Sequence, residues 1–210
     1  MIYLDSALVE QARQLTTLPW VKGITTNPTL LAQSPLSPTE TLQQLAHLSP
    51  GELYYQLLSV DYEAMLREGK QAYELIGEKT VLKIPATERG FRVVTALSPQ
   101  ITCSVTAIYH PIQAAIAAEA GAKYAIAYVN RATRLLGDGL ALVREMAQVL
   151  RGSSTEILAA SLKNPSEAAQ ALQAGADHLT VPFELLQAMT SHPLSEETVQ
   201  AFNQGGRGIL

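Results

Sequence analysis

Cysteine is scarce in this chain of 210 residues, whose only cysteine is Cys103. A single cysteine excludes both an internal disulfide framework and a thiolate zinc cluster, so we expect a reducing compartment. The four histidines lie far apart without a repeated metal-ligand spacing, and we therefore expect no metal site. We also expect no cofactor, because no G-x-G-x-x-G or P-loop motif follows an expected strand and no cradle for pyridoxal phosphate is evident.

Long apolar runs are also lacking. None approaches the ~18 residues of a membrane span, and the first residues, Met1–Asp5, have neither the basic start nor the apolar centre of a signal peptide. The net charge of -4 and the pI near 5.6 argue against nucleic acid or an anionic membrane as a partner. We expect a cytoplasmic protein, and a small anionic substrate would have to be bound by local cations instead of a general basic field.

What the chain does contain is a series of short apolar, β-branched segments, roughly 25 residues apart, each followed by a helical pattern. About eight such units indicate parallel strands with helical crossovers. With 47% hydrophobic and 16% charged residues, residues 1–210 are expected to form a single domain with a sizeable core. The expected strands are Ile2–Asp5, Gly23–Thr26, Leu53–Leu58, Thr80–Pro85, Ile101–Thr106, Tyr124–Tyr128, Ile157–Ser161 and Leu179–Pro182.

Two α/β architectures fit these units, a closed (β/α)8 TIM barrel and an open doubly wound sheet. An open sheet of this size usually has fewer strands, and its dinucleotide-binding motif is missing. A barrel typically needs ~250 residues, so this chain requires tight loops. We predict a (β/α)8 barrel with an extra C-terminal helix after Ser195, which can pack on a neighbouring subunit.

Helix ends are marked at several places. Ser6 is expected to cap a helix that begins near Ala7. Asn164 and the proline after it are expected to start a helix that ends before Gly175. The segment Ser34–Pro50, rich in Pro and Ser, is expected to form an extra helix with flanking turns.

Side chains alternate across a strand, so in a barrel one parity fills the interior and the other meets the helices. One choice of register places only polar residues on the inner face near the carboxyl ends: Asp5, Thr25, Gln56, Lys83, Thr106, Tyr128, Ser161 and Thr180. Their outward neighbours are mostly apolar, as at Leu4, Leu82, Val105 and Ala160. Burying unpaired polar atoms costs ~1–3 kcal/mol each, and active sites of this fold lie at the carboxyl ends of the strands. The alternation therefore predicts a polar pocket at that end.

Lys83 is the strongest single candidate because its segment, Thr80–Pro85, has no other charge. A lysine on a sheet edge usually reaches solvent, but a parallel strand that is covered on both faces has no wet side. A desolvated lysine more readily supplies the neutral amine that attacks a carbonyl. Without a pyridoxal phosphate cradle, that carbonyl is expected to belong to the substrate.

Three segments, Gly23–Thr29 (GITTNPT), Val81–Pro85 (VLKIP) and Ala159–Ser161 (AAS), resemble the small transaldolase family, and within it the fructose-6-phosphate aldolases. The resemblance covers essentially the whole chain, and T-T-N-P combined with K-I-P is its specific part. It implies a Schiff base on Lys83, a sugar or sugar-phosphate substrate, and a ring-based homo-oligomer of ten subunits whose C-terminal helix crosses to a neighbour. The other implied site residues are Asp5 and Asn27 for the donor hydroxyls, with Thr25 in support, Gln56 and Thr106 for a water, and Arg131 and Ser161 for a phosphate.

Two positions separate the branches of this family. Transaldolases usually carry Glu on the third strand and Phe on the sixth, whereas the aldolases carry Gln and Tyr, as this chain does at Gln56 and Tyr128. A phenol can pass a proton to the acceptor alkoxide, and glutamine can hold water without acting as a base. The chain departs from the family at Ile126, where a small residue is usual. This bulk is expected to crowd the terminal hydroxymethyl group of the donor.

The first hypothesis is reversible aldol cleavage of fructose 6-phosphate, or a similar ketose, to a dihydroxyacetone-type donor and glyceraldehyde 3-phosphate. The second is a transaldolase that transfers the three-carbon unit to an aldose phosphate. The third is a non-catalytic sugar-phosphate binding protein that uses Arg131 and Ser161. A metal-dependent aldolase is the weakest, because the scattered histidines offer no ligand set.

Overall fold

Eight parallel strands close into a barrel in chain order, with β8 paired to β1. The computed structural model describes residues 1–209, and Leu210, the last residue of the expected domain, lies outside the described residues. The (β/α)8 prediction is confirmed, and each expected strand agrees with an observed one to within two residues at either end. The strands are β1 Ile2–Asp5, β2 Val21–Thr25, β3 Glu52–Gln56, β4 Thr80–Pro85, β5 Thr102–Ile108, β6 Tyr124–Tyr128, β7 Glu156–Ala160 and β8 His178–Val181.

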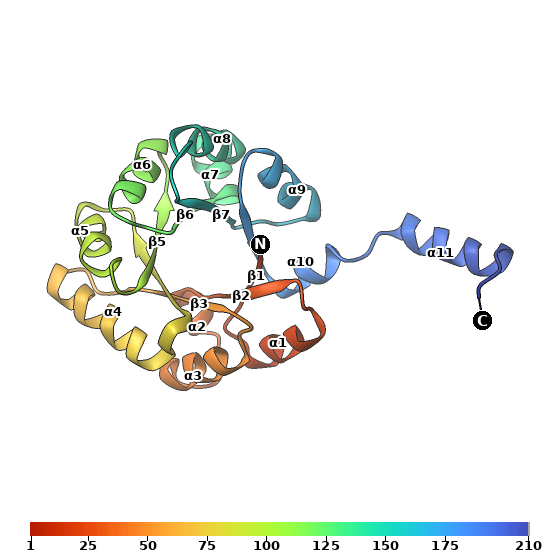
Figure 1. Ribbon diagram of the computed structural model, residues 1–210, viewed down its shortest axis with the longest axis horizontal. Coiled ribbons are helices and arrows are strands. Elements are labelled where there is room, and N and C mark those ends of the chain that lie inside the picture. The colour runs from red at the N-terminus through yellow and green to blue at the C-terminus, as the bar shows by residue number, and fades with distance from the viewer. Residues whose placement is uncertain (210) are drawn as a thin grey trace.

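Helices surround the barrel (Figure 1). Among residues 1–209, no helix combines the length and the apolar character needed to cross a membrane. The helices are α1 Val9–Arg13, η1 Gln14–Thr17, α2 Pro28–Leu31, α3 Pro38–Leu48, α4 Tyr62–Ile76, η2 Gly77–Lys79, α5 Glu88–Leu97, α6 Pro111–Glu119, α7 Val129–Leu136, α8 Gly139–Val149, α9 Pro165–Gln173, α10 Phe183–Ala188 and α11 Pro193–Gly205.

Two of the expected helix features need correction. Helix α1 begins at Val9, two residues after Ala7, but Ser6 does not cap it: Leu8 occupies the N-cap position with extended dihedrals, and Ser6 accepts the N–H of Leu8 at 3.0 Å. Helix α3 is the crossover between β2 and β3, so the segment 34–50 is a regular part of the barrel and not an addition to it. The expected start of α9 is confirmed, since Asn164 Oδ1 accepts the Glu167 N–H at 2.8 Å.

Apolar side chains bury both faces of the barrel strands, as expected of parallel strands with helical crossovers. Leu4, Leu82 and Val105 point outward and are fully buried under the helices. The interior is filled by a separate cluster. It consists of Tyr3, Tyr54, Val81, Tyr124, Ile126, Leu158 and Ala160, with Tyr128 packed against it.

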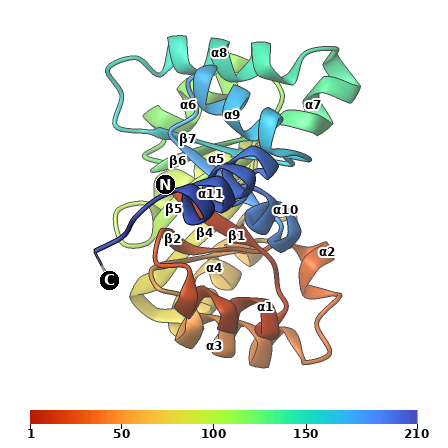
Figure 2. The ribbon, with the colours of Figure 1, turned by 90° about the vertical axis from the view of Figure 1, so that its right-hand side faces the viewer.

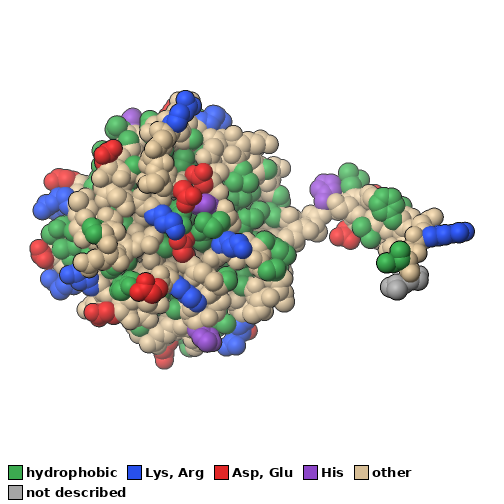
Figure 3. All heavy atoms as spheres, viewed as in Figure 1, with side chains coloured by type: hydrophobic (Ala, Val, Ile, Leu, Met, Phe, Trp, Pro, Cys, Tyr) green, Lys and Arg blue, Asp and Glu red, His purple; other side chains and the backbone are tan. Residues whose placement is uncertain are grey.

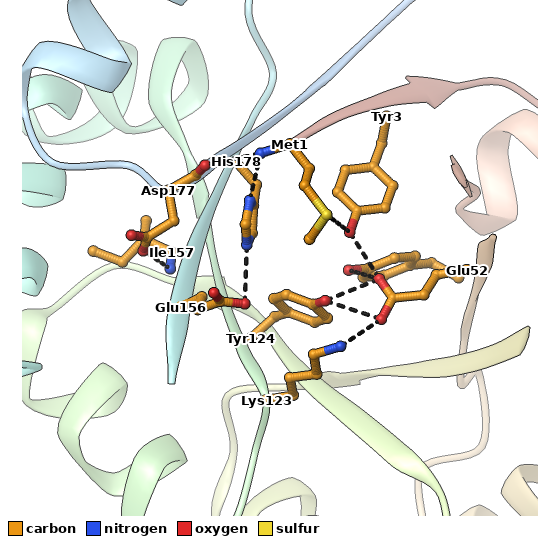
Figure 4. A network of polar contacts seen from close by, with 10 residues as sticks. Met1, Tyr3, Glu52, Lys123, Tyr124, Glu156, Ile157, Asp177 and His178 are labelled. Atoms are coloured by element: carbon orange, nitrogen blue, oxygen red, sulfur yellow. Dashed lines mark hydrogen bonds and ion pairs between the residues drawn. The ribbon is translucent and has the colours of Figure 1, made fainter. Parts of the chain in front are cut away.

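A polar network lies at the amino ends of the strands (Figure 4). The Glu52 carboxylate accepts hydrogen bonds from the hydroxyls of Tyr3 at 2.8 Å, Tyr124 at 2.9 Å and Tyr54 at 3.3 Å. Lys123 Nζ lies 2.8 Å from the same carboxylate. Burial by itself would raise the pKa of Glu52, but the hydrogen bonds from Lys123 and the tyrosines outweigh it and lower the pKa. The tyrosines thus fill the amino end of the barrel while their hydroxyls remain paired.

Helix α11 projects from the body beyond α10 (Figure 1), and Figure 2 views the molecule from that side. None of its residues is buried. Its large apolar side chains, Leu194, Val199 and Phe202, are 63%, 53% and 69% exposed, and hydrophobic atoms are visible on its surface in Figure 3. The expected C-terminal helix is therefore present, and its apolar side chains are not covered by its own barrel.

Candidate active site

A cavity of about 410 Å³ lies at the carboxyl ends of the strands. Parallel strands bring all their carboxyl ends to one end of the barrel, so residues from distant parts of the sequence meet there. Seven of the ten expected site residues line the cavity. The lining residues are Asp5, Asn27, Pro28, Thr29, Leu30, Gln56, Lys83, Tyr128, Arg131, Ala160, Ser161, Lys163 and Thr180.

Lys83 points into this cavity from the middle of β4 and is only 3% exposed. Its strand is paired to β3 and β5, with Gln56 and Ser104 as its register partners. Nζ donates a hydrogen bond to the carbonyl oxygen of Thr26 at 3.0 Å. The amine is therefore held inside the barrel wall, where a ligand in the cavity can reach it and bulk water largely cannot.

Asp5 lines the same cavity from the end of β1. Thr25 Oγ1 donates to Asp5 Oδ1 at 2.8 Å and lies 2.5 Å from the Thr180 hydroxyl, so two threonines hold the carboxyl in place. Burial raises the pKa of Asp5, while the positive charge of Lys83, the Thr25 hydrogen bond and the charge of Lys163 oppose that rise. Thr25 itself lies behind Asp5 and does not line the cavity.

Tyr128 brings a phenol to the cavity from the end of β6. The buried Thr106 donates a hydrogen bond from Oγ1 to the phenol oxygen at 2.6 Å. This arrangement leaves the phenol O–H free to donate to a ligand or a water. The guanidinium carbon of Arg131, in the first turn of α7, lies 5.3 Å from the centroid of the same ring.

Gln56 and Asn27 complete the polar wall next to Lys83. Gln56 is the last residue of β3. Asn27 follows β2, and its Oδ1 accepts the N–H of Leu30 at 3.0 Å to cap the short helix α2. Because Oδ1 is occupied in this way, the amide nitrogen of Asn27 can serve as a donor to a hydroxyl.

Three groups suited to an anion line the cavity beyond the carboxyl ends of β6 and β7. Arg131, Ser161 and Lys163 all line the cavity, close to the amino end of the nine-residue helix α9. Helix amino ends carry positive potential. Sequence reasoning missed Lys163. Its position two residues beyond Ser161, past the end of an expected strand, was the available signal.

The parity prediction is wrong for β7. Ala160 was expected to point outward, but it lies in the interior cluster and lines the cavity. Ser161 follows the strand and has φ of +60°, in the left-handed region. This turn of the backbone brings Ser161 into the same cavity as its neighbour, which a continued strand would not allow.

Ile126 lies deeper in the barrel than the other expected site residues. It is 1% exposed, belongs to the interior cluster and does not line the cavity. Two residues of the cavity wall, Tyr128 and Ala160, pack in or against the same cluster. Any effect of Ile126 on a bound ligand would therefore act through the positions of Tyr128 and Ala160.

The family model described as "Transaldolase/Fructose-6-phosphate aldolase" matches residues 2–206. A probable transaldolase of Anaeromyxobacter dehalogenans (strain 2CP-C) is 34% identical over 203 residues, which cover 95% of this chain and 93% of that protein. Probable transaldolases of Hydrogenobaculum sp. (strain Y04AAS1) and Aquifex aeolicus (strain VF5) are 35% and 34% identical, with the same coverage.

Among solved structures, the chain is similar in fold to a mandelate oxidase mutant with a monooxide FMN adduct. The TM-score is 0.66 at 18% sequence identity, and the match covers 96% of this chain and 74% of that chain. A second mandelate oxidase structure, with 4-Br-2-hydroxy-methylphenylacetate, gives a TM-score of 0.65 at 18% identity, covering 98% of this chain and 75% of that chain. At this level of identity the similarity shows the barrel fold alone.

Proposed function

Because this chain belongs to the transaldolase/fructose-6-phosphate aldolase family of enzymes, we propose that it is a Schiff-base aldolase. Its proposed reaction is reversible cleavage of fructose 6-phosphate, or a similar ketose, to a dihydroxyacetone-type donor and glyceraldehyde 3-phosphate. The observation that supports it most is the buried amine of Lys83 in a cavity shared with Asp5 and Tyr128. Burying an amine costs free energy. Covalent reaction with a substrate carbonyl explains the burial, because it requires the amine to lie inside the cavity.

In the proposed cycle, the neutral Nζ of Lys83 adds to the ketone carbon, and with the uptake of one proton water leaves, which gives a protonated imine. The hydroxyl on C4 passes its proton to the water beside Tyr128, and the C3–C4 bond breaks. Its electron pair moves toward the imine nitrogen, which forms an enamine, and glyceraldehyde 3-phosphate departs. The enamine takes up that proton at C3, and hydrolysis of the resulting protonated imine releases the donor and one proton and restores the neutral lysine.

Tyr128 is proposed to handle the C4 hydroxyl proton through a water held beside Gln56 and Thr106. Thr106 orients the phenol oxygen by donating to it, and Gln56 lines the cavity from the strand next to Lys83. A positioned proton carrier of this kind typically contributes about 10²–10⁴-fold to rate. On the donor side, Asp5 and Asn27 are proposed to bind hydroxyls, with Thr25 holding Asp5.

The phosphate of the substrate is proposed to bind Arg131, Ser161 and Lys163. Two cations and a hydroxyl suit a dianion, and the amino end of α9 adds to the attraction. This cluster supports a phosphorylated substrate in a chain whose overall charge is negative.

Reduction with borohydride in the presence of a ketone tests the Schiff base. Wild-type protein should gain the mass of one reduced donor per chain, and Lys83→Met should gain none. Lys163→Met is the matched control, because it removes the other lysine that lines the cavity, and it should still be labelled. Equal labelling of Lys83→Met would show that the amine is assigned wrongly.

Transaldolase activity is the second candidate, because the curated relatives named above are probable transaldolases. The choice of aldolase rests on Gln56 and Tyr128. Incubation with fructose 6-phosphate alone separates the two: an aldolase releases glyceraldehyde 3-phosphate steadily, whereas a transaldolase without an acceptor gives only a stoichiometric burst. Full activity in EDTA is expected in either case.

We further propose that the chain forms a homo-oligomer, with a decamer as the expected size, through α11. A 13-residue helix is marginal in water by itself, and the exposed Leu194, Val199 and Phe202 suit burial against a second copy. Sedimentation should show a smaller particle for Phe202→Asp but not for the control Gln200→Asp on the same helix. The cytoplasmic location and the single-domain organisation stay predictions.

A further inference from the structure

The carboxylate of Glu68, on helix α4, accepts hydrogen bonds from the end of β3 and from the loop that follows it. Its Oε1 accepts hydrogen bonds from the Tyr55 hydroxyl at 2.8 Å and the Leu58 N–H at 2.9 Å, and its Oε2 accepts the Ser59 N–H at 2.8 Å. Burial by itself would raise the pKa of Glu68, but the hydrogen bonds from Leu58, Ser59 and Tyr55 outweigh it and lower the pKa. The group is therefore a carboxylate at neutral pH with both oxygens engaged.

These contacts lie on both sides of Gln56. Tyr55 precedes it, and Leu58 and Ser59 follow it after a single residue, Leu57, whose N–H donates to the Lys83 carbonyl at 3.0 Å. Within residues 1–209, no hydrogen bond holds the amide of Gln56 itself, whereas three from Glu68 hold the residues around it. The backbone of Gln56 is paired with Lys83 on β4, and Glu68 holds the residues on either side of it, so both elements set the direction of the Gln56 side chain.

Packing holds the first residue of this loop, Leu57, which is 2% exposed and part of the core, but does little for the residues after it. Leu58 and Val60 are 63% and 78% exposed, and Ser59 and Val60 border a second cavity of about 350 Å³ between the loops after β3 and β4. A loop with few buried contacts opens easily unless hydrogen bonds hold it. The Glu68 carboxylate supplies three such bonds from a single point on a 15-residue helix.

We propose that Glu68 is a positioning residue for the reaction, acting through Gln56. By clamping the residues on both sides of Gln56, its carboxylate sets where the Gln56 amide points in the cavity, and with it the place of the water that serves Tyr128. The inference rests on the proposed aldolase function. Small displacements of a positioning group impair the chemical step more than the binding of substrate, which other residues of the cavity carry.

The test compares Glu68→Ala, Glu68→Gln and the control Glu74→Ala, which removes an exposed carboxylate from the same helix. Fructose 6-phosphate cleavage is measured at steady state, and each rate is divided by the fraction of Lys83 that borohydride can trap. Glu68→Ala should lower kcat by about 10-fold with KM changed by less than about 2-fold. Glu68→Gln, which keeps one acceptor oxygen, should lose less, and Glu74→Ala should match wild type.

A double-mutant cycle separates positioning from a general structural effect. In a Gln56→Ala background, Glu68→Ala should cause no further loss of kcat, because the residue through which it acts is gone. An additive loss in that background, a wild-type kcat for Glu68→Ala, or an equal rise in KM would overturn the inference. If Glu68→Ala fails to fold, Tyr55→Phe replaces it in the same cycle, because it removes one of the three hydrogen bonds.

The two proposals fail in different ways. Wild-type protein that forms no borohydride adduct and releases no aldehyde contradicts the aldolase function. Wild-type protein that does both, with kcat insensitive to Glu68, contradicts only the positioning role.

Discussion

Replacing Tyr128 with Phe would remove one oxygen from the cavity and leave the ring in place. The ring packs against the interior cluster of the barrel and has the Arg131 guanidinium carbon 5.3 Å from its centroid. Neither contact needs the hydroxyl. The change therefore isolates the phenol oxygen, which Thr106 contacts at 2.6 Å.

The expected loss of cleavage rate follows from the proton transfer that we assign to the Tyr128 oxygen. Loss of a positioned general acid or base usually costs ~10²–10⁴-fold in rate. A water near Gln56 and Thr106 could still carry the proton, so we expect the lower end, about 100-fold in kcat for cleavage. Thr106 is 1% exposed and would lose its acceptor, which should lower the free energy of unfolding by ~1–3 kcal/mol.

The assay measures glyceraldehyde 3-phosphate release from fructose 6-phosphate, together with borohydride trapping of the donor. Tyr128→Phe should still form the adduct, because Lys83 and Asp5 are intact, while cleavage falls. Tyr62→Phe is the matched control, since that tyrosine begins helix α4 and its ring faces Arg92 at 4.7 Å. Cleavage by Tyr128→Phe at the wild-type rate would refute the reasoning, and loss of the adduct would show that the phenol acts earlier, in imine formation.

The remaining predictions concern other parts of the barrel. Burial raises the pKa of Asp5, so folding binds a proton more tightly there and this group's contribution to stability falls as pH rises above its ordinary pKa of 3.8. Asp5→Asn should therefore unfold at higher urea than wild type at pH 7 but not at pH 3, while cleavage is lost; lower stability at pH 7 would contradict this. Glu52→Leu should lower the free energy of unfolding by ~1–3 kcal/mol for each buried tyrosine hydroxyl left unpaired, with KM unchanged because it lies at the opposite end of the barrel; a raised KM would argue against that separation. Ser161 and Ala107 both have positive φ, +60° and +59°, so Ser161→Gly and Ala107→Gly should each relieve roughly 1 kcal/mol of strain. Only Ser161→Gly should raise KM for a phosphorylated ketose. Equal KM values in the two variants would show that Ser161 does not bind the phosphate. Ile126→Ala should cost ~2–5 kcal/mol in urea unfolding and raise kcat/KM for donors with a terminal hydroxymethyl group, and an unchanged donor preference would show that Ile126 does not shape that end.

The fold and much of the site could be read from local patterns. Strand and helix periodicities depend on residues close in sequence, so the eight strands were expected to within two residues of where they lie. Alternation along regular strands was enough to bring Asp5, Gln56, Lys83 and Tyr128 to the same cavity. The family could be read from motifs near Asn27 and Lys83 for the same reason, since those motifs are contiguous.

Other features depended on the closed barrel. Parity predicts direction only while the strand stays regular, so the left-handed turn at Ser161 reversed the assignment of Ala160. Lys163 lies beyond that turn, where no periodicity applies. The hydrogen bonds to Glu52 join residues from different strands, and the hydrogen bonds to Glu68 join helix α4 to β3 and to the loop after it. Periodicity indicates which face a side chain takes, but its partners across the barrel are set by closure and register, which depend on the whole chain.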